Sequence, residues 1–233
     1  RSSRLPRASP TNAGAPHRTQ AVSALSFARM GKTVSTTPLF VFSGGGTGGH
    51  LYPGLAVAEA LLNRRPDAEI IFFTTDRDLD RRLLAQHGRA QIVQRVRPFT
   101  AKPLRMPAFV WALWSSTRAA RRFIRARRPR AVLGLGGYAA APPVIAARRE
   151  NVPRAILNPD AVPGRSNRWI AASADVAFLQ WEIAAEAFPR QTATQVVGCP
   201  IRRAFRSATR DAGCAAFGLD PARPVLVVTG ASQ

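Results

Sequence analysis

The sequence has 233 residues, enough for one sizeable α/β domain with appendages. Its hydrophobic content of 46% excludes a chain that is disordered throughout, two cysteines are too few for a disulfide framework, and no apolar run reaches the roughly 18 residues of a membrane span. The net charge of +21 suits nucleic acid, an anionic membrane surface or a phosphorylated substrate. Arginine-rich composition from GC-rich coding gives the same charge, so charge alone does not decide among them.

Residues 1–37 are predicted to form a disordered basic extension. They contain six Lys and Arg, no acidic residue and no sustained hydrophobic period. Organelle transit peptides share this composition. Met30 stands just ahead of the first predicted strand, and we expect it to be the natural start of the protein.

From residue 38 onward, short apolar runs alternate with helical patterns. The predicted strands cover residues 38–43, 69–74, 91–95, 131–135, 154–157, 176–179 and 193–197. The predicted helices cover residues 51–64, 79–87, 107–127, 142–149, 165–172 and 182–187. This alternation predicts an α/β fold in which helices cover both faces of a parallel sheet and ligands bind at the carboxyl ends of the strands.

The sequence also predicts how the chain is divided. Residues 38–198 form the sheet domain, and residues 199–223, which are rich in Pro, Gly and charge, form a linker. The run PVLVVT at residues 224–229 is predicted to be the first strand of a second domain, which residues 224–233 only begin.

The strongest local motif is GGGTGGH at residues 44–50, between a predicted strand and a predicted helix. Glycine turns at a helix N-terminus present backbone N–H groups to anions such as phosphate. The motif is not a P-loop, because no Lys-Ser/Thr follows. Gly44, Gly46 and Gly49 match the dinucleotide pattern G-x-G-x-x-G, but the acidic residue expected about 20 residues later is missing at that spacing, and Asp76 comes later.

His50 is the candidate catalytic residue of this motif. An imidazole exchanges protons near neutral pH and could take one from a sugar hydroxyl. A histidine in this position could instead cap or pack the helix. Its place beside the glycines, at the carboxyl end of a strand, favours the catalytic interpretation.

Two further motifs follow strands of the same predicted sheet. GLGGY at residues 134–138 is a second glycine turn, and NPDAVPGRSNR at residues 158–168 is a loop dense in hydrogen-bonding groups. Two glycine turns at one sheet edge suit an elongated diphosphate, although each alone could be a simple tight turn. The polar loop is more consistent with ligand contact than with a solvated turn.

The predicted helix over residues 107–127 combines bulky apolar residues with a run of arginines. Phe109, Trp111 and Trp114 beside that run resemble an interfacial membrane anchor. A helix that packs on a sheet also needs apolar side chains, so a core role remains the alternative.

Taken together, the motifs resemble the MurG family of two-domain GT-B glycosyltransferases. The similar segments, in order, are GGTGGH followed by YPGLAVA, GLGGY followed by two prolines, VGCPIR at residues 197–202 and VVTGASQ at residues 227–233. The resemblance implies that the chain is the Rossmann-like, acceptor-binding N-terminal domain of such an enzyme, with its C-terminal domain truncated.

The resemblance implies an activity as well. Family members transfer N-acetylglucosamine from UDP-N-acetylglucosamine, with inversion, to lipid I (undecaprenyl-pyrophosphoryl-muramoyl-pentapeptide) and so form lipid II for peptidoglycan. They act peripherally on the anionic cytoplasmic face of the inner membrane, and the resemblance implies neither a cofactor, a metal nor a nucleic-acid partner. Because the C-terminal domain carries most of the uridine pocket, the 233-residue chain alone is expected to transfer no sugar.

The resemblance also implies site residues. His50 is the base. The implied substrate-binding residues are Thr47, Gly48, Gly49, Gly136, Gly137, Tyr138, Asn158, Asp160, Arg202 and Ser232. One departure concerns the HEQN segment of the family, where this chain reads LNPD and Asp160 replaces an Asn that is expected to bind the donor; Asn158 could substitute.

Three other functions compete with this prediction. Another GT-B enzyme or an epimerase that uses a nucleotide sugar would share the fold. A nucleic-acid-binding module would explain the charge but not the glycine turns. A dinucleotide-dependent oxidoreductase is the third alternative, which a titration with NAD(P) would test.

Overall fold

The computed structural model describes residues 37–98 and 102–228 of the chain. Its strands are β1 (Leu39–Gly44), β2 (Glu69–Thr74), β3 (Ala90–Val93), β4 (Ala131–Gly136), β5 (Arg154–Asn158), β6 (Val176–Leu179) and β7 (Ala193–Val196). Its helices are α1 (Gly48–Arg64), α2 (Asp78–Gln86), α3 (Met106–Arg127), α4 (Ala141–Arg149), α5 (Arg165–Ala171), α6 (Arg203–Ser207) and α7 (Arg210–Phe217), with short 3-10 helices η2 (Pro103–Arg105), η3 (Tyr138–Ala140) and η4 (Glu182–Ala187). The predicted alternation of strands and helices is therefore confirmed.

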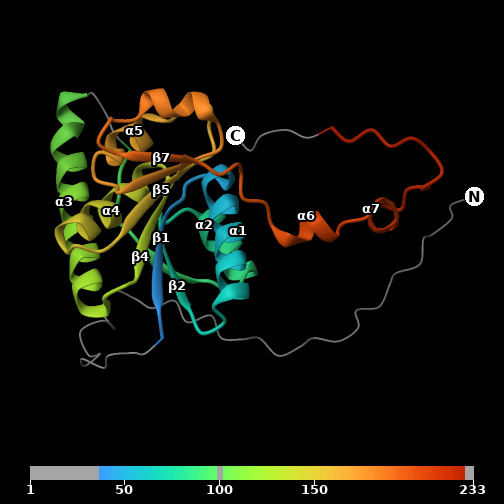
Figure 1. Ribbon diagram of the computed structural model, residues 1–233, viewed down its shortest axis with the longest axis horizontal. Helices are drawn as coiled ribbons and strands as arrows, with labels where there is room; N and C mark the ends of the chain where they lie inside the picture. Colours follow the sequence, from blue (N-terminus) through green and yellow to red (C-terminus); the bar gives the residue numbers. More distant parts are fainter. Residues whose placement is uncertain (1–36, 99–101, 229–233) are drawn as a thin grey trace, which may run out of the picture.

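The strands form one parallel sheet in the order β3-β2-β1-β4-β5-β6-β7. Helices α1 and α2 cover one face, and α3, α4 and α5 cover the other (Figure 1). Alternate residues of a strand point to opposite faces, so Val41 joins the core under α3 and α4 while Phe42 joins the core under α1. The predicted Rossmann-like α/β fold is confirmed.

Strands β1 and β4 are neighbours in the sheet, and the order of the strands reverses between them. Strands β2 and β3 extend the sheet on one side of β1, whereas β4 to β7 extend it on the other. In such sheets, the crevice outside the carboxyl ends of the strands at this switch point is the usual ligand site. The two glycine motifs begin in the last residues of these two strands and continue beyond them.

Helix α3 is joined to the end of α4 by Glu150, whose residue surface is only 9% exposed. Its carboxylate accepts hydrogen bonds from Arg121 and from Arg125, the latter over 3.1 Å. Arg121, and after it Arg125, hold the pKa of Glu150 below its ordinary value. The two cations therefore stabilise the ionised carboxylate in the folded protein.

This ion pair predicts a pH dependence of stability. A lowered folded pKa adds stability above the unfolded value of about 4.3, and that contribution is lost as the pH falls through the folded value. We expect Glu150→Gln to unfold at lower denaturant concentration than the parent at neutral pH, and the difference to shrink below about pH 4. Urea unfolding across this range measures it, with the exposed Glu186→Gln as control. A pH-independent difference would contradict the prediction.

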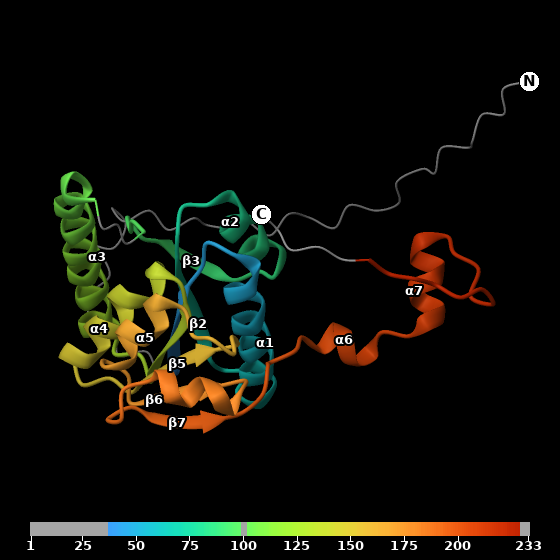
Figure 2. The same cartoon turned by 90° about the horizontal axis from the view of Figure 1, so that it is seen from above.

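The segment after β7 differs from its prediction. The predicted linker over residues 199–223 contains α6 and α7, and both lie apart from the sheet in two orthogonal views (Figures 1 and 2). The predicted strand over residues 224–229 is wrong for its described part, residues 224–228, which have no strand structure. Leu226 and Val228 are 88% and 85% exposed, because no neighbouring strand pairs with this run or buries it.

Two predictions fall on residues that the structure does not describe. The basic extension lies outside the described residues except for Thr37, and so do residues 229–233 of the predicted second domain. The division into domains at residues 198 and 223 stays a prediction. Within residues 37–98 and 102–228, none of the helices combines the length and the apolar character that crossing a bilayer requires.

Candidate functional site at the switch point

The two glycine turns meet where β1 and β4 end side by side. Gly44 of β1 pairs with Gly136 of β4, after a register shift between Ser43 and Gly44. The shift turns the chain out of the sheet, as bulges do next to functional sites. Gly46 has a φ of 85° and Gly136 has a φ of 108°, backbone conformations that residues with a side chain rarely adopt.

The first turn leads into the N-terminus of α1, with Thr47 as its N-cap residue. Gly48 and Gly49 are the first residues of the helix, and such residues have no intrahelical partner for their N–H groups. Together with the helix dipole, these groups attract anions. The sequence-predicted trio Thr47, Gly48 and Gly49 therefore lies at a geometrically suitable diphosphate site.

The amide of Gly46 is bound inside the protein. The Gly46 N–H donates to both carboxylate oxygens of Asp80, over 2.9 and 3.0 Å, and Asp80 is fully buried. Asp80 also accepts from the Thr75 hydroxyl over 2.5 Å and from the Thr75 N–H over 3.2 Å. Arg77 Nη1 donates to the Gly46 carbonyl oxygen over 2.7 Å. Both backbone groups of Gly46 are thus held by side chains from the β2–α2 region.

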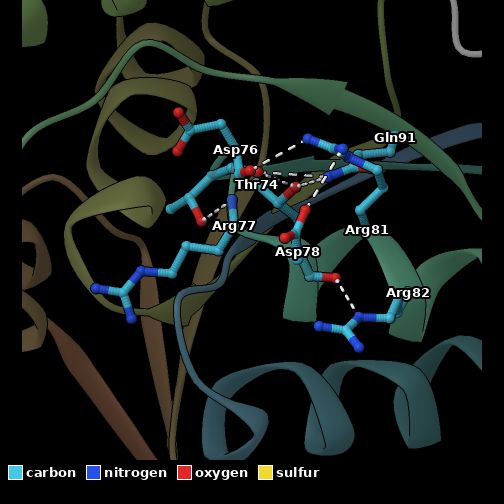
Figure 3. Close-up of polar contacts among 8 residues, drawn as sticks. Thr74, Asp76, Arg77, Asp78, Arg81, Arg82 and Gln91 are labelled. Atoms are coloured by element: carbon cyan, nitrogen blue, oxygen red, sulfur yellow. Dashed lines mark hydrogen bonds and ion pairs between the residues drawn. The ribbon is translucent and has the colours of Figure 1, made fainter.

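The β2–α2 turn with Arg77, and the first turn of α2 that follows it, are themselves braced by polar contacts (Figure 3). Gln91 Nε2 donates to Thr74 Oγ1 over 2.6 Å and so ties β3 to the end of β2. Arg81 donates to the carbonyl oxygen of Asp76 over 3.3 Å. The side chain of Arg77 extends to the opposite side from Arg81 and Arg82, and it is therefore available to reach Gly46.

His50 lies in the first turn of α1 and is half-buried. Its Nδ1 is 3.1 Å from Thr47 Oγ1 and 3.4 Å from the Gly45 carbonyl oxygen. A carbonyl oxygen only accepts hydrogen bonds, so the contact with Gly45 favours the tautomer that carries its proton on Nδ1. That tautomer leaves a lone pair on Nε2, which is the state a general base needs.

The second glycine turn makes room for this imidazole. A Cβ atom added at Gly136 would lie 2.7 Å from His50 Cδ2 and 3.0 Å from Nε2, and one added at Gly137 would lie 3.0 Å from the Gly45 carbonyl oxygen. The lack of side chains at Gly136 and Gly137 thus allows the two turns to approach each other with His50 between them. The structure brings together His50, both turns and the half-buried Tyr138, as the sequence predicted.

Asn158, the predicted substitute for the donor contact, lies at the end of β5 and holds the loop that follows. Its side chain is fully buried, its Nδ2 donates to the Asp160 carbonyl oxygen over 2.6 Å, and its Oδ1 accepts from Asn167 Nδ2 over 3.0 Å. Both ends of its amide hold the loop, and its contact with a substrate stays a prediction. Asp160 itself is exposed, and its contact with a ligand stays a prediction.

Asn167 is a residue that the sequence reasoning missed. It is buried, and its Nδ2 donates a hydrogen bond to Asn158 Oδ1. Among the residues that the structure describes, its Oδ1 has no hydrogen-bond partner, and a Cβ atom added at Gly136 would lie 3.5 Å from it. A buried acceptor beside the second glycine turn can accept a hydrogen bond that a ligand hydroxyl donates.

Arg202 approaches the first turn through Tyr52. Its guanidinium lies 4.4 Å from the centre of the Tyr52 ring, and Tyr52 Cε2 would be 3.1 Å from a Cβ atom at Gly48. The predicted ligand residue Arg202 therefore stands one aromatic ring away from the helix N-terminus. The predicted contact Ser232 lies outside the described residues.

The predicted membrane-contact residues fall on different sides of α3. Trp111 and Trp114 are 60% and 57% exposed, whereas Phe109 is half-buried and faces a pocket beside Tyr138. The membrane contact predicted for Phe109 stays a prediction. Several arginines of this helix also serve the fold, since Arg121 and Arg125 bind Glu150 and Arg127 binds Glu69.

The chemistry available at the switch point is anion binding next to a base. The amides of Gly48 and Gly49 and the half-buried imidazole of His50 lie at the first glycine turn, whose Gly46 carbonyl oxygen accepts from Arg77. Among the described residues, no group of three or more His, Cys, Asp or Glu side chains could hold a metal ion.

The sequence of the site region matches a known family. A profile of the glycosyltransferase family 28 N-terminal domain covers residues 40–179, which is more than half of the chain and extends from β1 to β6. The chain belongs to glycosyltransferase family 28. Every residue of the two glycine turns lies within the family 28 match.

Individual relatives agree with this family. Two UDP-N-acetylglucosamine–N-acetylmuramyl-(pentapeptide) pyrophosphoryl-undecaprenol N-acetylglucosamine transferases are similar to the chain. That of Clavibacter sepedonicus is 37% identical, and that of Caldanaerobacter subterraneus is 29% identical, each over 83% of this chain. The match covers 53% and 54% of those proteins, respectively, so this chain spans about half of their length.

Solved structures give the same fold. MurG of Acinetobacter baumannii is 26% identical with a TM-score of 0.58, over 71% of this chain and 46% of that one. A UDP-N-acetylglucosamine 2-epimerase of Methanocaldococcus jannaschii superposes with a TM-score of 0.52 over 70% of this chain and 45% of that one, at 13% identity. The epimerase likeness supports the GT-B type of fold and no more.

Proposed function

We propose that the protein transfers N-acetylglucosamine from UDP-N-acetylglucosamine to lipid I, with inversion, and so forms lipid II. The observation that carries this proposal is the position of His50 Nε2, which faces the second glycine turn while the amides of Gly48 and Gly49 begin α1 beside it. Membership of glycosyltransferase family 28 and the names of the similar transferases support the choice of substrates.

In the proposed reaction, His50 Nε2 takes the proton from the O4 hydroxyl of the muramoyl sugar. The oxygen attacks the anomeric carbon of N-acetylglucosamine, the bond to the UDP oxygen breaks, and UDP leaves with the bonding electron pair. Attack opposite the leaving group inverts the anomeric centre. Fixed amides at the helix N-terminus stabilise negative charge on a diphosphate without rearrangement, and no metal takes part in this scheme.

A transfer assay tests the proposal. The protein produced from its complete gene is incubated with radiolabelled UDP-N-acetylglucosamine and a lipid I analogue, and label is expected to move to the lipid. A parallel reaction without acceptor distinguishes the main alternative, since an epimerase would convert UDP-N-acetylglucosamine by itself. Conversion without acceptor, or no transfer with it, would refute the proposal.

We further propose that the protein binds the anionic cytoplasmic face of the inner membrane through the exposed start of α3. Leu104 of η2 and Val110, Trp111 and Trp114 of α3 expose more than half of their surface there, and Arg118 lies 5.8 Å from the centre of the Trp114 ring. Exposed aromatic side chains beside cations are typical of surfaces that bind anionic lipid headgroups.

The affinity of the protein for lipid vesicles tests this second proposal. Replacing Trp111 and Trp114 with Ser is expected to weaken binding to phosphatidylglycerol-containing vesicles about tenfold for each tryptophan, because burying a large apolar side chain contributes roughly 1.5–3 kcal/mol. Trp181→Ser, which changes a tryptophan that is 50% exposed on another surface, serves as the control. Equal losses from Trp181→Ser and the α3 variants in a sedimentation assay would contradict the prediction.

A further inference from the structure

A pocket of about 580 Å³ opens beside the second glycine turn. It lies between the start of α3, η3, the start of α5 and the chain that follows β3. Its volume is in the range of sites that bind small molecules, roughly 300–1,000 Å³. The side chains that matter for its chemistry are those of Arg97, Phe109, Leu113, Tyr138, Arg165 and Trp169.

The walls of the pocket are mainly apolar, and helix α3 supplies two of them. Phe109 and Leu113 are separated by one helical turn and both line the pocket. Val110 and Trp114 form the neighbouring stripe and are 54% and 57% exposed on the surface. The pocket and the proposed membrane-binding surface are thus adjacent stripes of one helix, so an apolar chain can pass from one to the other.

Positive charge accompanies these apolar walls. Arg97, after β3, and Arg165, at the start of α5, both line the pocket and are both exposed. Tyr138 lines it directly after Gly137, whose position is close to His50 Nδ1. This combination suits a ligand with an anionic head at the glycine turn and an apolar tail. Inorganic diphosphate alone would leave the aromatic and aliphatic walls without a matching partner.

We propose that this pocket binds the isoprenoid units next to the diphosphate of a polyprenyl diphosphate, with the diphosphate between Arg165 and the second glycine turn. The proposal rests on the proposed function, whose acceptor is a lipid of this class. It adds that the protein itself, and not only the bilayer, recognises the first part of the lipid. Lipid recognition then orients the muramoyl sugar towards His50.

Trp169 in the pocket wall provides a direct probe. The chain has four tryptophans, and replacing Trp111, Trp114 and Trp181 with Phe leaves Trp169 as the only reporter. We expect farnesyl diphosphate to shift the emission of Trp169 to shorter wavelength and to bind at least about tenfold more tightly than inorganic diphosphate, because burying even two methylene groups is worth that much. Equal affinity for the two ligands would overturn the proposal. This comparison uses an unmodified pocket.

A substitution that fills the pocket with a larger side chain gives the second test. Ser166 lines the pocket and is half-buried, so Ser166→Phe is expected to weaken farnesyl diphosphate binding about tenfold and to leave inorganic diphosphate binding unchanged. Arg168→Phe adds the same side chain to an exposed position of the same helix and is the control. Equal effects of the two variants, or no effect of Ser166→Phe in a protein with parental circular dichroism, would overturn the proposal.

The outcome can be separated from that of the transfer assay. If transfer occurs but farnesyl diphosphate and inorganic diphosphate bind equally, the pocket proposal fails and the proposed function stands. If farnesyl diphosphate is preferred but no sugar is transferred, the proposed function fails while the pocket still binds a prenyl diphosphate.

Discussion

Replacing His50 with Ala in the protein produced from its complete gene is expected to lower kcat for sugar transfer by about 10²–10⁴-fold, the usual contribution of a positioned general base. The contact of Nδ1 with the Gly45 carbonyl oxygen leaves the Nε2 lone pair towards Gly136. Without the imidazole, the attacking hydroxyl keeps its proton until water removes it. Steady-state transfer to a lipid I analogue measures the loss.

His50→Asn separates proton transfer from loop support. An asparagine amide can still donate to the Gly45 carbonyl oxygen, but it is not basic. We therefore expect His50→Asn to be nearly as inactive as His50→Ala while unfolding at a temperature closer to that of the parent. If His50→Asn kept most of the activity, the role of His50 would be structural.

His87→Ala is the matched control for the histidine variants. His87 Nδ1 lies 2.9 Å from the carbonyl oxygen of Leu83 in the helix that it follows. It caps the end of α2, away from the glycine turns. We expect parental kcat from His87→Ala. An undiminished rate in His50→Ala would exclude the proposed base.

The sequence predicted the sheet because its signals are local. Apolar runs that end at glycines, such as residues 38–43, and helices that begin near proline, such as α3, are both visible within a short window. The position of the site follows from strand order at the switch point. Sequence reasoning reached it because both glycine motifs directly follow strands.

The partners of the glycine turn could not be predicted in the same way. Gly46 and Asp80 are separated by 34 residues, and their hydrogen bonds form only when α2 packs beside α1. A signal did exist, since Asp80 stands on the same helical face as Leu83 and Leu84, which are both buried. A carboxylate on the apolar face of a short helix indicates a buried partner.

Asn167 is likewise a polar residue on the buried face of a helix. Ile170 and Ala171, one turn later in α5, are buried on the same face. The run at residues 224–228 shows the opposite case, in which a local signal predicts an element that does not form. Its β-favouring residues predict a strand, but a strand forms only beside a partner that pairs with its backbone. Local sequence therefore identifies candidates, and the packed fold decides which of them form.

Replacing Asp80 with Asn is expected to lower the free energy of unfolding by about 1–3 kcal/mol, the cost of leaving a buried hydrogen-bonding group without its partner. Asp80 accepts from Gly46 and from Thr75, and both are donors. An asparagine would turn its amide N–H groups towards at least one of them. Denaturant unfolding at neutral pH measures the change.

Asp78→Asn is the matched control, because Asp78 is exposed at the start of the same helix and its ion pair with Arg81 lies at the surface. Surface pairs of this kind contribute little to stability. Equal stability of Asp80→Asn and Asp78→Asn would contradict the proposal that the Asp80 carboxylate stabilises the first glycine turn.

The larger effect of Asp80→Asn is expected on ligand binding. Because the Gly46 amide is held by Asp80, the amides at the start of α1 that remain for a diphosphate are those of Gly48 and Gly49, and their direction depends on the turn that Asp80 fixes. We expect folded Asp80→Asn to bind inorganic diphosphate about tenfold more weakly, since losing one charge-assisted hydrogen bond costs about 1.5–3 kcal/mol. Calorimetry at a temperature where both proteins are folded separates this loss from unfolding. Parental affinity in a destabilised Asp80→Asn would mean that Asp80 supports the fold without positioning the anion site.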